Sequence, residues 1–288
     1  MEWRGRRALV TGASGFIGAH LVRRLAELGA DVHGASRTGS GHDLRDQGAV
    51  DGLFAAVRPE VVFHLASEVN GARDVSVVRP TLEGNLKSTV NVLTAAAGSG
   101  CRVVLAGSSE EPRPGNGHTP APSPYAMAKA AATGYAELYH RLWNVPCTIV
   151  RPTMVYGPGQ RDTAKLVPYV TLALTRGEKP RLTSGSKVVD WVYIDDVVEA
   201  FALAGLSERA IGQAFDVGTG TKVSVREAVE LLYRIAGEES APPFGTVPDR
   251  LLDVPQVADP GPARELIGWR PRVGLEDGLR RTVAWYRR

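Results

Sequence analysis

The segment Thr11-Gly12-Ala13-Ser14-Gly15-Phe16-Ile17-Gly18 decides the fold of this chain. The apolar run Ala8-Leu9-Val10 precedes it, and an amphipathic segment from Ala19 to Leu28 follows it. Glycines at this spacing between a strand and a helix are typical of a dinucleotide-binding turn, in which the last glycine lets the helix pack closely on the strand. The unpaired amides that open such a helix favour an anion. The alternative is a glycine-rich connection that binds no ligand.

Strand and helix patterns alternate through the first half of the chain. This alternation predicts an α/β fold with a doubly wound parallel sheet of the Rossmann type, in which ligands bind beyond the carboxyl ends of the strands. We expect a dinucleotide-binding domain over residues 1–152, with later returns near 190–220, and a smaller C-terminal substrate-binding lobe over 153–288. The expected strands are 31–35, 61–65, 102–106, 147–150 and 214–217. The expected helices are 47–57, 81–97, 123–142, 166–176, 193–203, 225–236, 261–267 and 275–286.

The composition indicates a globular enzyme. The chain has 288 residues, and its formal net charge of +3 is too small to indicate nucleic-acid binding. Its two cysteines, Cys101 and Cys147, lie at apolar strand-like runs, so we expect buried free thiols and a cytoplasmic location. The six histidines are scattered, which predicts no metal site. We expect neither a signal peptide nor a membrane span.

The end of the second expected strand predicts the cofactor. Proteins that bind NAD usually carry an acidic residue here, about 20 residues after the glycines, to bind the ribose 2′-hydroxyl. Ser36 and Arg37 stand in this place. Arg37 can bind a 2′-phosphate in bidentate fashion, so we favour NADP(H), with NAD(H) as the alternative. Arg37 can also be a solvated loop residue.

Tyr125 and Lys129 form a candidate acid–base pair, because a spacing of four places both side chains on one face of the expected helix. A nearby ammonium and an oxidised nicotinamide stabilise a phenolate, and Tyr125 can then exchange a proton with a carbinol oxygen. The segment Ser108-Ser109-Glu110-Glu111 follows strand 102–106 at the ligand edge. A serine hydroxyl there can bond the same oxygen, although loop serines are more often turn or cap residues.

Several motifs together resemble the extended short-chain dehydrogenase/reductase family, in its branch of nucleotide-sugar epimerases, dehydratases and reductases. The resemblance covers nearly the whole chain. The motifs that carry it are the glycine segment, Asp43-Leu44-Arg45-Asp46, His64-Leu65-Ala66, Asn85 to Thr89, the set Ser109/Tyr125/Lys129, Arg151-Pro152, Tyr156 to Gly159, Asp190 to Asp196, and Gly268-Trp269.

The resemblance implies a role for each matched position. Asp43 and Leu44 would flank the adenine, Leu65 and Ala66 would line the nicotinamide side, and Asn85 would lie behind a ribose. Lys129 would also bond the nicotinamide ribose. The full set of expected cofactor contacts is Gly12, Ser14, Gly15, Phe16, Ile17, Gly18, Ser36, Arg37, Asp43, Leu44, Leu65, Ala66, Asn85, Tyr125, Lys129 and Pro152.

A nucleotide-sugar substrate is also implied by the resemblance. Arg250 matches an arginine that binds the diphosphate. Met154 and Val189 replace the asparagine and the arginine that often contact the substrate in this family, and Lys187 can compensate. The expected substrate contacts are Ser67, Glu68, Thr153, Gln160, Lys187 and Arg250.

The reaction depends on Glu110 and Glu111. Two acidic residues at this place act as acid and base in 4,6-dehydratases, whereas this stretch also looks like that of 4-keto-6-deoxyhexose reductases; one glutamate can also be structural. Because NADPH suits reduction, we expect an NADPH-dependent ketoreductase that acts on an NDP-4-keto-6-deoxyhexose. In this reaction Tyr125 donates the proton and Ser109 polarises the ketone. The alternatives are a 4,6-dehydratase or 4-epimerase with retained NAD(P), and a non-catalytic NADP-binding regulator. Family members pair through helices corresponding to 81–97 and 123–142, which implies a homodimer.

Overall fold

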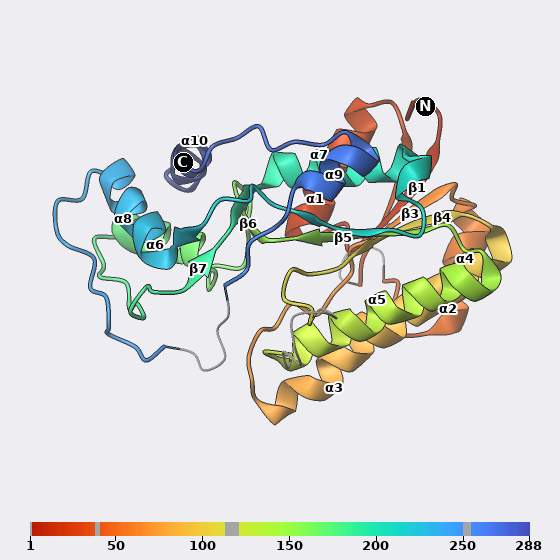
Figure 1. Cartoon of the computed structure of the whole chain (residues 1–288), viewed down its shortest axis with the longest axis horizontal. Coiled ribbons are helices and arrows are strands. Elements are labelled where there is room, and N and C mark those ends of the chain that lie inside the picture. Colours follow the sequence, from red (N-terminus) through yellow and green to blue (C-terminus); the bar gives the residue numbers. More distant parts are fainter. Residues whose placement is uncertain (1, 38–40, 113–120, 250–254) are drawn as a thin grey trace. The chain divides into compact units, whose positions relative to one another are not determined.

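The computed structural model describes residues 2–37, 41–112, 121–249 and 255–288 (Figure 1). The chain forms two compact units. The first unit comprises Met1–Pro152, Val198–Asp216 and Gly261–Trp269, and the second comprises Thr153–Val197, Val217–Pro260 and Arg270–Arg288.

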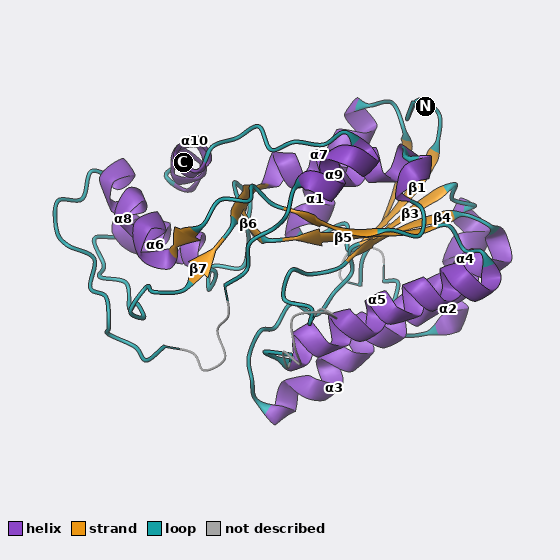
Figure 2. Cartoon of the chain, viewed as in Figure 1, coloured by secondary structure: helices purple, strands orange, loops and turns teal. Residues whose placement is uncertain are grey.

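A six-stranded sheet forms the centre of the first unit, in the order β2-β1-β3-β4-β5-β9. The pairs from β2 to β5 are parallel, and the strands are β1 Arg7–Thr11, β2 Asp31–Ala35, β3 Val61–His64, β4 Arg102–Ala106, β5 Cys147–Pro152 and β9 Ala214–Val217. In Figures 1 and 2, helices α2 (Gln47–Val57), α4 (Ser88–Ser99) and α5 (Pro124–Trp143) lie on one face. Helices α1 (Phe16–Glu27), α7 (Ile194–Leu206) and α9 (Gly261–Ile267) lie on the other. The predicted doubly wound sheet is confirmed.

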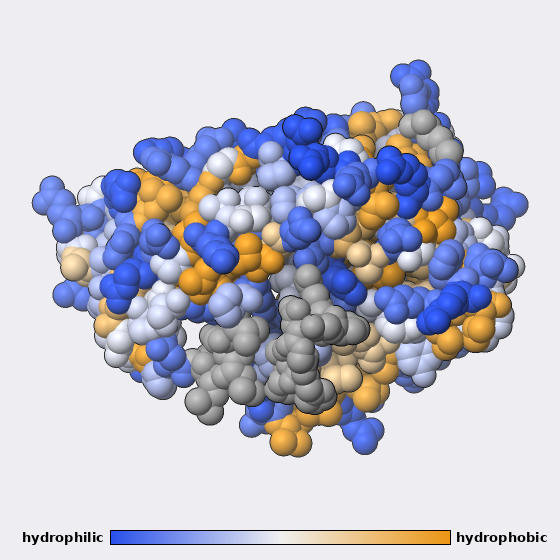
Figure 3. All heavy atoms as spheres, viewed as in Figure 1, coloured by the Kyte–Doolittle hydropathy of each residue, from blue (hydrophilic) through white to orange (hydrophobic). Residues whose placement is uncertain are grey.

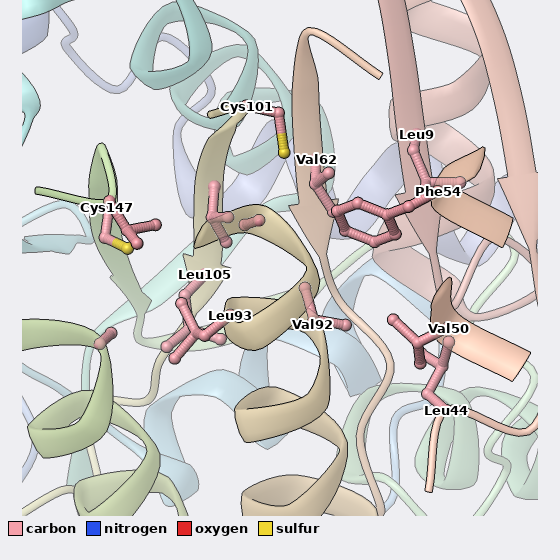
Figure 4. Close-up of a cluster of buried hydrophobic side chains, with 14 of the residues drawn as sticks. Leu9, Leu44, Val50, Phe54, Val62, Val92, Leu93, Cys101, Leu105 and Cys147 are labelled. Atoms are coloured by element: carbon pink, nitrogen blue, oxygen red, sulfur yellow. The ribbon is translucent and has the colours of Figure 1, made fainter. Parts of the chain in front are cut away.

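The core between the sheet and α2, α4 and α5 is apolar (Figure 4). Inward-facing strand residues such as Leu9, Val62 and Leu105 meet Phe54 and Leu93 from the helices. Continuous apolar strands are expected where both faces of a parallel sheet are covered. The two cysteines are buried free thiols in this core, as predicted.

The helix expected over 81–97 is interrupted. The structure has a short 3-10 turn η1 (Val75–Val77), then α3 (Val78–Thr81), a π-helical segment η2 (Leu82–Lys87), and finally α4. A π-helical turn leaves extra backbone freedom and is often found at functional sites. It contains Asn85, whose side chain is buried.

The second unit contains two small sheets and three helices of its own. Strand β6 (Met154–Tyr156) pairs with β8 (Trp191–Tyr193), and β7 (Val188–Val189) pairs with β10 (Val223–Ser224). The helices are α6 (Leu166–Thr175), α8 (Val225–Ala236) and α10 (Leu275–Tyr286). Ser224 and Glu227 form a reciprocal capping box that begins α8.

Asp190 organises the loops of the second unit. Its buried carboxylate accepts hydrogen bonds from Thr219 N (2.8 Å), Thr219 Oγ1 (2.6 Å), Gly220 N (2.8 Å) and Ala258 N (3.2 Å). A Cβ at Gly218 would lie 2.5 Å from Asp190 Oδ2, so this approach requires glycine. Among the described residues, no helix is long and apolar enough to cross a bilayer.

Candidate active site

The glycine turn lies directly after β1 and meets the loop after β3. Gly12 has φ +69, and a Cβ there would lie 2.7 Å from Ala66 N. A Cβ at Gly18 would lie 2.1 Å from Gly12 O. Gly15 is the N-cap of α1, and no side chain caps this helix, so the amides of Phe16 and Ile17 are oriented for an anion. These features fit the diphosphate of a dinucleotide.

A buried chain of hydrogen bonds joins β1, β3 and α4. Thr89 Oγ1 donates to Asn85 O (2.6 Å), so it must accept from His64 Nε2 (3.2 Å). Thr11 Oγ1 accepts from Ala66 N (3.2 Å) and donates to His64 Nδ1 (2.8 Å). Burial, helped by the positive charge of Lys129, lowers the pKa of His64 to about 3. His64 is therefore a neutral structural residue with one defined tautomer.

Asn85 fixes the loop after β3. Its Oδ1 accepts from Ser67 Oγ (2.8 Å) and Glu68 N (2.7 Å), and its Nδ2 donates to Glu68 O (3.1 Å). Ser67 and Glu68 are half-buried. The Ser67 hydroxyl proton is thus directed at Asn85, and contact of this loop with a substrate remains a prediction.

The region after β2 has no carboxylate at position 36. Arg37 is exposed and lies near Asp43, whose pKa falls to about 2 because Arg45 hydrogen-bonds it. The Arg45–Asp43 contacts are 2.8 Å from Nε to Oδ1 and 2.6 Å from Nη2 to Oδ2. The Leu44 side chain is packed in the core and its carbonyl accepts from Asn91 Nδ2 (2.9 Å); its contact with an adenine remains a prediction.

The start of α5 positions the acid–base pair. Ser123 caps this helix by accepting from Ala126 N (3.1 Å), and Pro124 occupies its first turn. Lys129 is buried, its Nζ donates to Ala106 O (2.8 Å), and Nζ lies 5.9 Å from the centre of the Tyr125 ring. Burial lowers the pKa of Lys129 to about 8, opposed by the charge of Glu111.

Of the two serines, Ser108 acts on the Tyr125 phenol, through a side-chain hydrogen bond that lowers the pKa of Tyr125. This bond favours the phenolate, whereas burial and the charges of Glu110 and Glu111 raise the pKa of Tyr125. Successive side chains of extended backbone point to opposite sides, so a shift of one residue reverses their direction. Backbone bonds from Gly107 N to Val150 O (2.8 Å) and from Ser109 N to Pro152 O (3.3 Å) continue the ladder beyond β4 and direct Ser108 inward.

Glu111 is not a free carboxylate. It accepts hydrogen bonds from Ser108 N (2.6 Å), Thr133 Oγ1 (2.8 Å) and Arg151 Nε (3.0 Å), and its side chain is 1% exposed. Both of its oxygens are thus engaged, which removes Glu111 from the acid–base role considered from the sequence. Glu110 is half-buried and lies close enough to Tyr125 to act on its pKa.

The remaining predicted substrate residues belong to the second unit. Thr153 is buried and its N–H donates to Val217 O (3.0 Å). Gln160 is buried, and its carbonyl accepts from the Tyr286 hydroxyl. Lys187 is half-buried, and its carbonyl accepts from Val225 N (2.9 Å). Arg250 lies outside the described residues, and Val189, which stands where an arginine is often found, is wholly buried in β7.

Comparison with known proteins identifies the family. The sequence profile described as "NAD dependent epimerase/dehydratase family" matches residues 8–218. The chain belongs to this family. It is therefore an enzyme of the extended short-chain dehydrogenase/reductase class, as the resemblance implied.

Individual relatives match over the whole chain. The chain is 35% identical to a UDP-glucose 4-epimerase of Mycolicibacterium smegmatis, over 98% of each protein. It is 30% identical to a dTDP-glucose 4,6-dehydratase of an Actinoplanes species, again over 98% of each. Its structure resembles that of a Thermus thermophilus UDP-glucose 4-epimerase in complex with NAD, with a TM-score of 0.85, 32% identity, and coverage of 98% of this chain and 99% of the other.

We expect His64 to make stability depend on pH. The unfolded histidine has an ordinary pKa of 6.5 and the folded one about 3, so the unfolded chain binds the extra proton between these values. The free energy of unfolding should fall as the pH drops through this window. His64→Gln keeps a donor and an acceptor but does not titrate. The difference in unfolding free energy between wild type and variant, measured by urea denaturation, should shrink toward acid pH; a constant difference would contradict a neutral buried histidine.

We expect Ser108, and not Ser109, to contribute to catalysis. Ser108→Ala removes the hydroxyl that contacts Tyr125 and should lower kcat about 100-fold, the cost typical of losing one active-site donor. Ser109→Ala is the matched control and should lower kcat less than about fivefold, within the small effects of substitutions outside the chemistry. The measurement is steady-state turnover of a nucleotide sugar. The reverse order of effects would assign the hydroxyl to Ser109.

Proposed function

We propose that the enzyme inverts C4 of a nucleoside-diphosphate hexose while retaining its cofactor, as a 4-epimerase. The observation that carries this proposal is the engagement of Glu111, which leaves Tyr125 as the acid–base group beside Lys129 and Ser108. Epimerisation at C4 needs one group that removes a proton from the C4 hydroxyl and later returns it. A bound nicotinamide cofactor would accept the C4 hydride and return it to the opposite face.

The residues of the chain perform the proton chemistry. Tyr125 removes the hydroxyl proton as the hydride leaves C4, and gives it back when the ketone is reduced. Lys129 supplies a positive charge near the phenolate. Because Ser108 stabilises the phenolate through a hydrogen bond, it supports Tyr125 in the proton-accepting state. The amides and glycines of the 11–18 turn would orient the cofactor diphosphate.

A 4,6-dehydratase needs more than this. It must also protonate the leaving 6-hydroxyl and remove a proton from C5, which requires an acid and a base besides the tyrosine. Glu110 is available for one of these tasks, whereas the Arg151–Glu111 ion pair occupies the second carboxylate. The distribution of roles between the two glutamates therefore favours epimerisation.

A ketoreductase that uses NADPH is the second candidate. It is favoured by Ser36 and Arg37, because a site without a carboxylate after β2 accommodates the 2′-phosphate of NADP. The two candidates differ in cofactor use, since a net reductase consumes one NADPH per turnover.

Two buried thiols, which are kept reduced in the cytoplasm, support action in that compartment.

We expect the purified enzyme to convert UDP-glucose into UDP-galactose without net change at the reduced-nicotinamide absorption band. Tyr125→Phe should abolish conversion and leave cofactor binding nearly intact, because it removes only the phenol hydroxyl. Products are followed by proton NMR. Stoichiometric loss of NADPH with a 4-keto-6-deoxyhexose nucleotide would establish the reductase instead, and formation of a 4-keto-6-deoxy product from a hexose nucleotide would establish the dehydratase.

We also propose that the enzyme is a homodimer formed through α3, η2 and α5. Met127, Tyr135, Leu138 and Leu142 lie on one face of α5, and each is more than a third exposed. Val75, Val78 and Leu82 add exposed apolar surface nearby, and Figure 3 shows apolar atoms in the region of α3. Exposed apolar side chains gathered on neighbouring helices are typical of a protein–protein interface.

We expect Leu142→Glu to shift the protein from dimer to monomer, because it places a charge on a face that dimerisation buries. Sedimentation velocity measures the change. Trp285→Glu is the control, since Trp285 is also exposed but lies on α10. A wild-type protein that sediments at the mass of a single chain would contradict the dimer.

A further inference from the structure

We propose that Glu111 is a positioning residue that aims the Ser108 hydroxyl at Tyr125. This inference rests on the proposed function for its kinetic consequence, whereas its geometric consequence stands on the structure alone. A carboxylate directly after the active-site serines invites the interpretation of a catalytic base. Its contacts assign it the task of fixing the backbone that carries Ser108.

Glu111 is hydrogen-bonded to both main-chain polar groups of Ser108. Its Oε1 accepts from Ser108 N (2.6 Å), and its own N–H donates to Ser108 O (3.2 Å). A main-chain donor and a main-chain acceptor of the same residue are thus held by one partner. Ser108 therefore has little freedom to rotate about its backbone.

The remaining hydrogen bond on Ser108 directs its proton. Ser108 Oγ accepts from Glu110 N (3.1 Å), so this lone pair is occupied and the O–H is directed elsewhere. Burial raises the pKa of Tyr125, whereas its hydrogen bond with the Ser108 side chain lowers it, which is the effect of a hydroxyl that donates to the phenol. The turn from Ser108 to Glu111 thus acts as one unit that presents a donor to the tyrosine.

The carboxylate also fixes this turn to two other elements. Oε2 accepts from Thr133 Oγ1 on α5 (2.8 Å) and from Arg151 Nε on β5 (3.0 Å). Thr133 lies eight residues after Tyr125, on the same side of α5, so the helix that carries the tyrosine and the turn that carries the serine share one anchor. Arg151 pairs with this buried carboxylate, and the attraction between them offsets part of the cost of burying the charge.

The backbone leaves room for this arrangement only because residue 107 is glycine. A Cβ at Gly107 would lie 2.7 Å from Glu111 Oε1 and 2.9 Å from Arg151 Cγ. The Glu111 side chain is 1% exposed, so a sugar proton cannot reach either oxygen without breaking the network. Glu111 therefore acts through Ser108 and not on the substrate.

The test is a double-mutant cycle with a structural arm. In Glu111→Gln, the amide NH2 faces a hydrogen-bond donor, so Ser108 N–H or the Thr133–Arg151 pair loses its acceptor. We expect kcat to fall about 30-fold, less than the loss of about 100-fold expected when the Ser108 hydroxyl itself is removed, with the KM of the sugar nucleotide nearly unchanged. Ser108→Ala/Glu111→Gln should be no slower than Ser108→Ala alone, because coupled residues are non-additive. Additive losses would overturn the proposal.

The control and the structural arm separate this proposal from the proposed function. Glu137→Gln makes the same chemical change at an exposed site of α5 and should leave kcat unchanged. Thr133→Val removes one donor but keeps the ion pair, so it provides a milder variant if Glu111→Gln does not fold. In crystal structures of Glu111→Gln and Thr133→Val, the Ser108 hydroxyl should move away from the Tyr125 hydroxyl. An unchanged contact would refute the positioning role, even if no sugar nucleotide is turned over by the wild type.

Discussion

The hydrogen bond between Thr11 and His64 joins the two strand ends on which the cofactor site is built. Both residues are inaccessible to water, so each donor and acceptor must be satisfied within the protein. A neutral imidazole meets this requirement, because its second nitrogen continues the chain of hydrogen bonds to Thr89 and the carbonyl of Asn85. The glycine turn, the loop after β3 and the π-helical turn are thereby fixed relative to one another without a buried charge.

The buried charges of Lys129 and Glu111 near Tyr125 are each hydrogen-bonded or ion-paired. Lys129 is kept in the interior by the carbonyl of Ala106, and burial moves its pKa toward neutrality. Glu111 counteracts that shift and is itself compensated by Arg151. The same carboxylate thus raises the pKa of Lys129 and holds the backbone N–H of Ser108. An electrostatic environment of this kind is organised in advance of binding, which is the usual source of transition-state stabilisation in enzymes.

Local patterns predict most of this fold. The glycine turn, the apolar strands and the capped helices are encoded over short stretches, and the structure confirms the sheet that they imply. Tyr125 and Lys129 are predictable because helical spacing alone brings them to one face. The structure differs from the sequence-based prediction where contacts between distant segments determine the role of a side chain. Ser108 and Ser109 are chemically equal in sequence, and only the ladder with β5 selects the inward-facing one. The role of Glu111 depends on Thr133 and Arg151, which are distant in the chain. The π-helical turn at Asn85 has no clear local signature.

We propose that this site transfers a hydride at C4 of a nucleotide sugar. It is tested most directly with a UDP-hexose that carries deuterium at C4, mixed with enzyme and cofactor in a single turnover and quenched for mass spectrometry of the nicotinamide. We expect deuterium to appear transiently on the nicotinamide ring in the wild type and not to appear in Tyr125→Phe. Formation of product without passage of deuterium through the nicotinamide would contradict it.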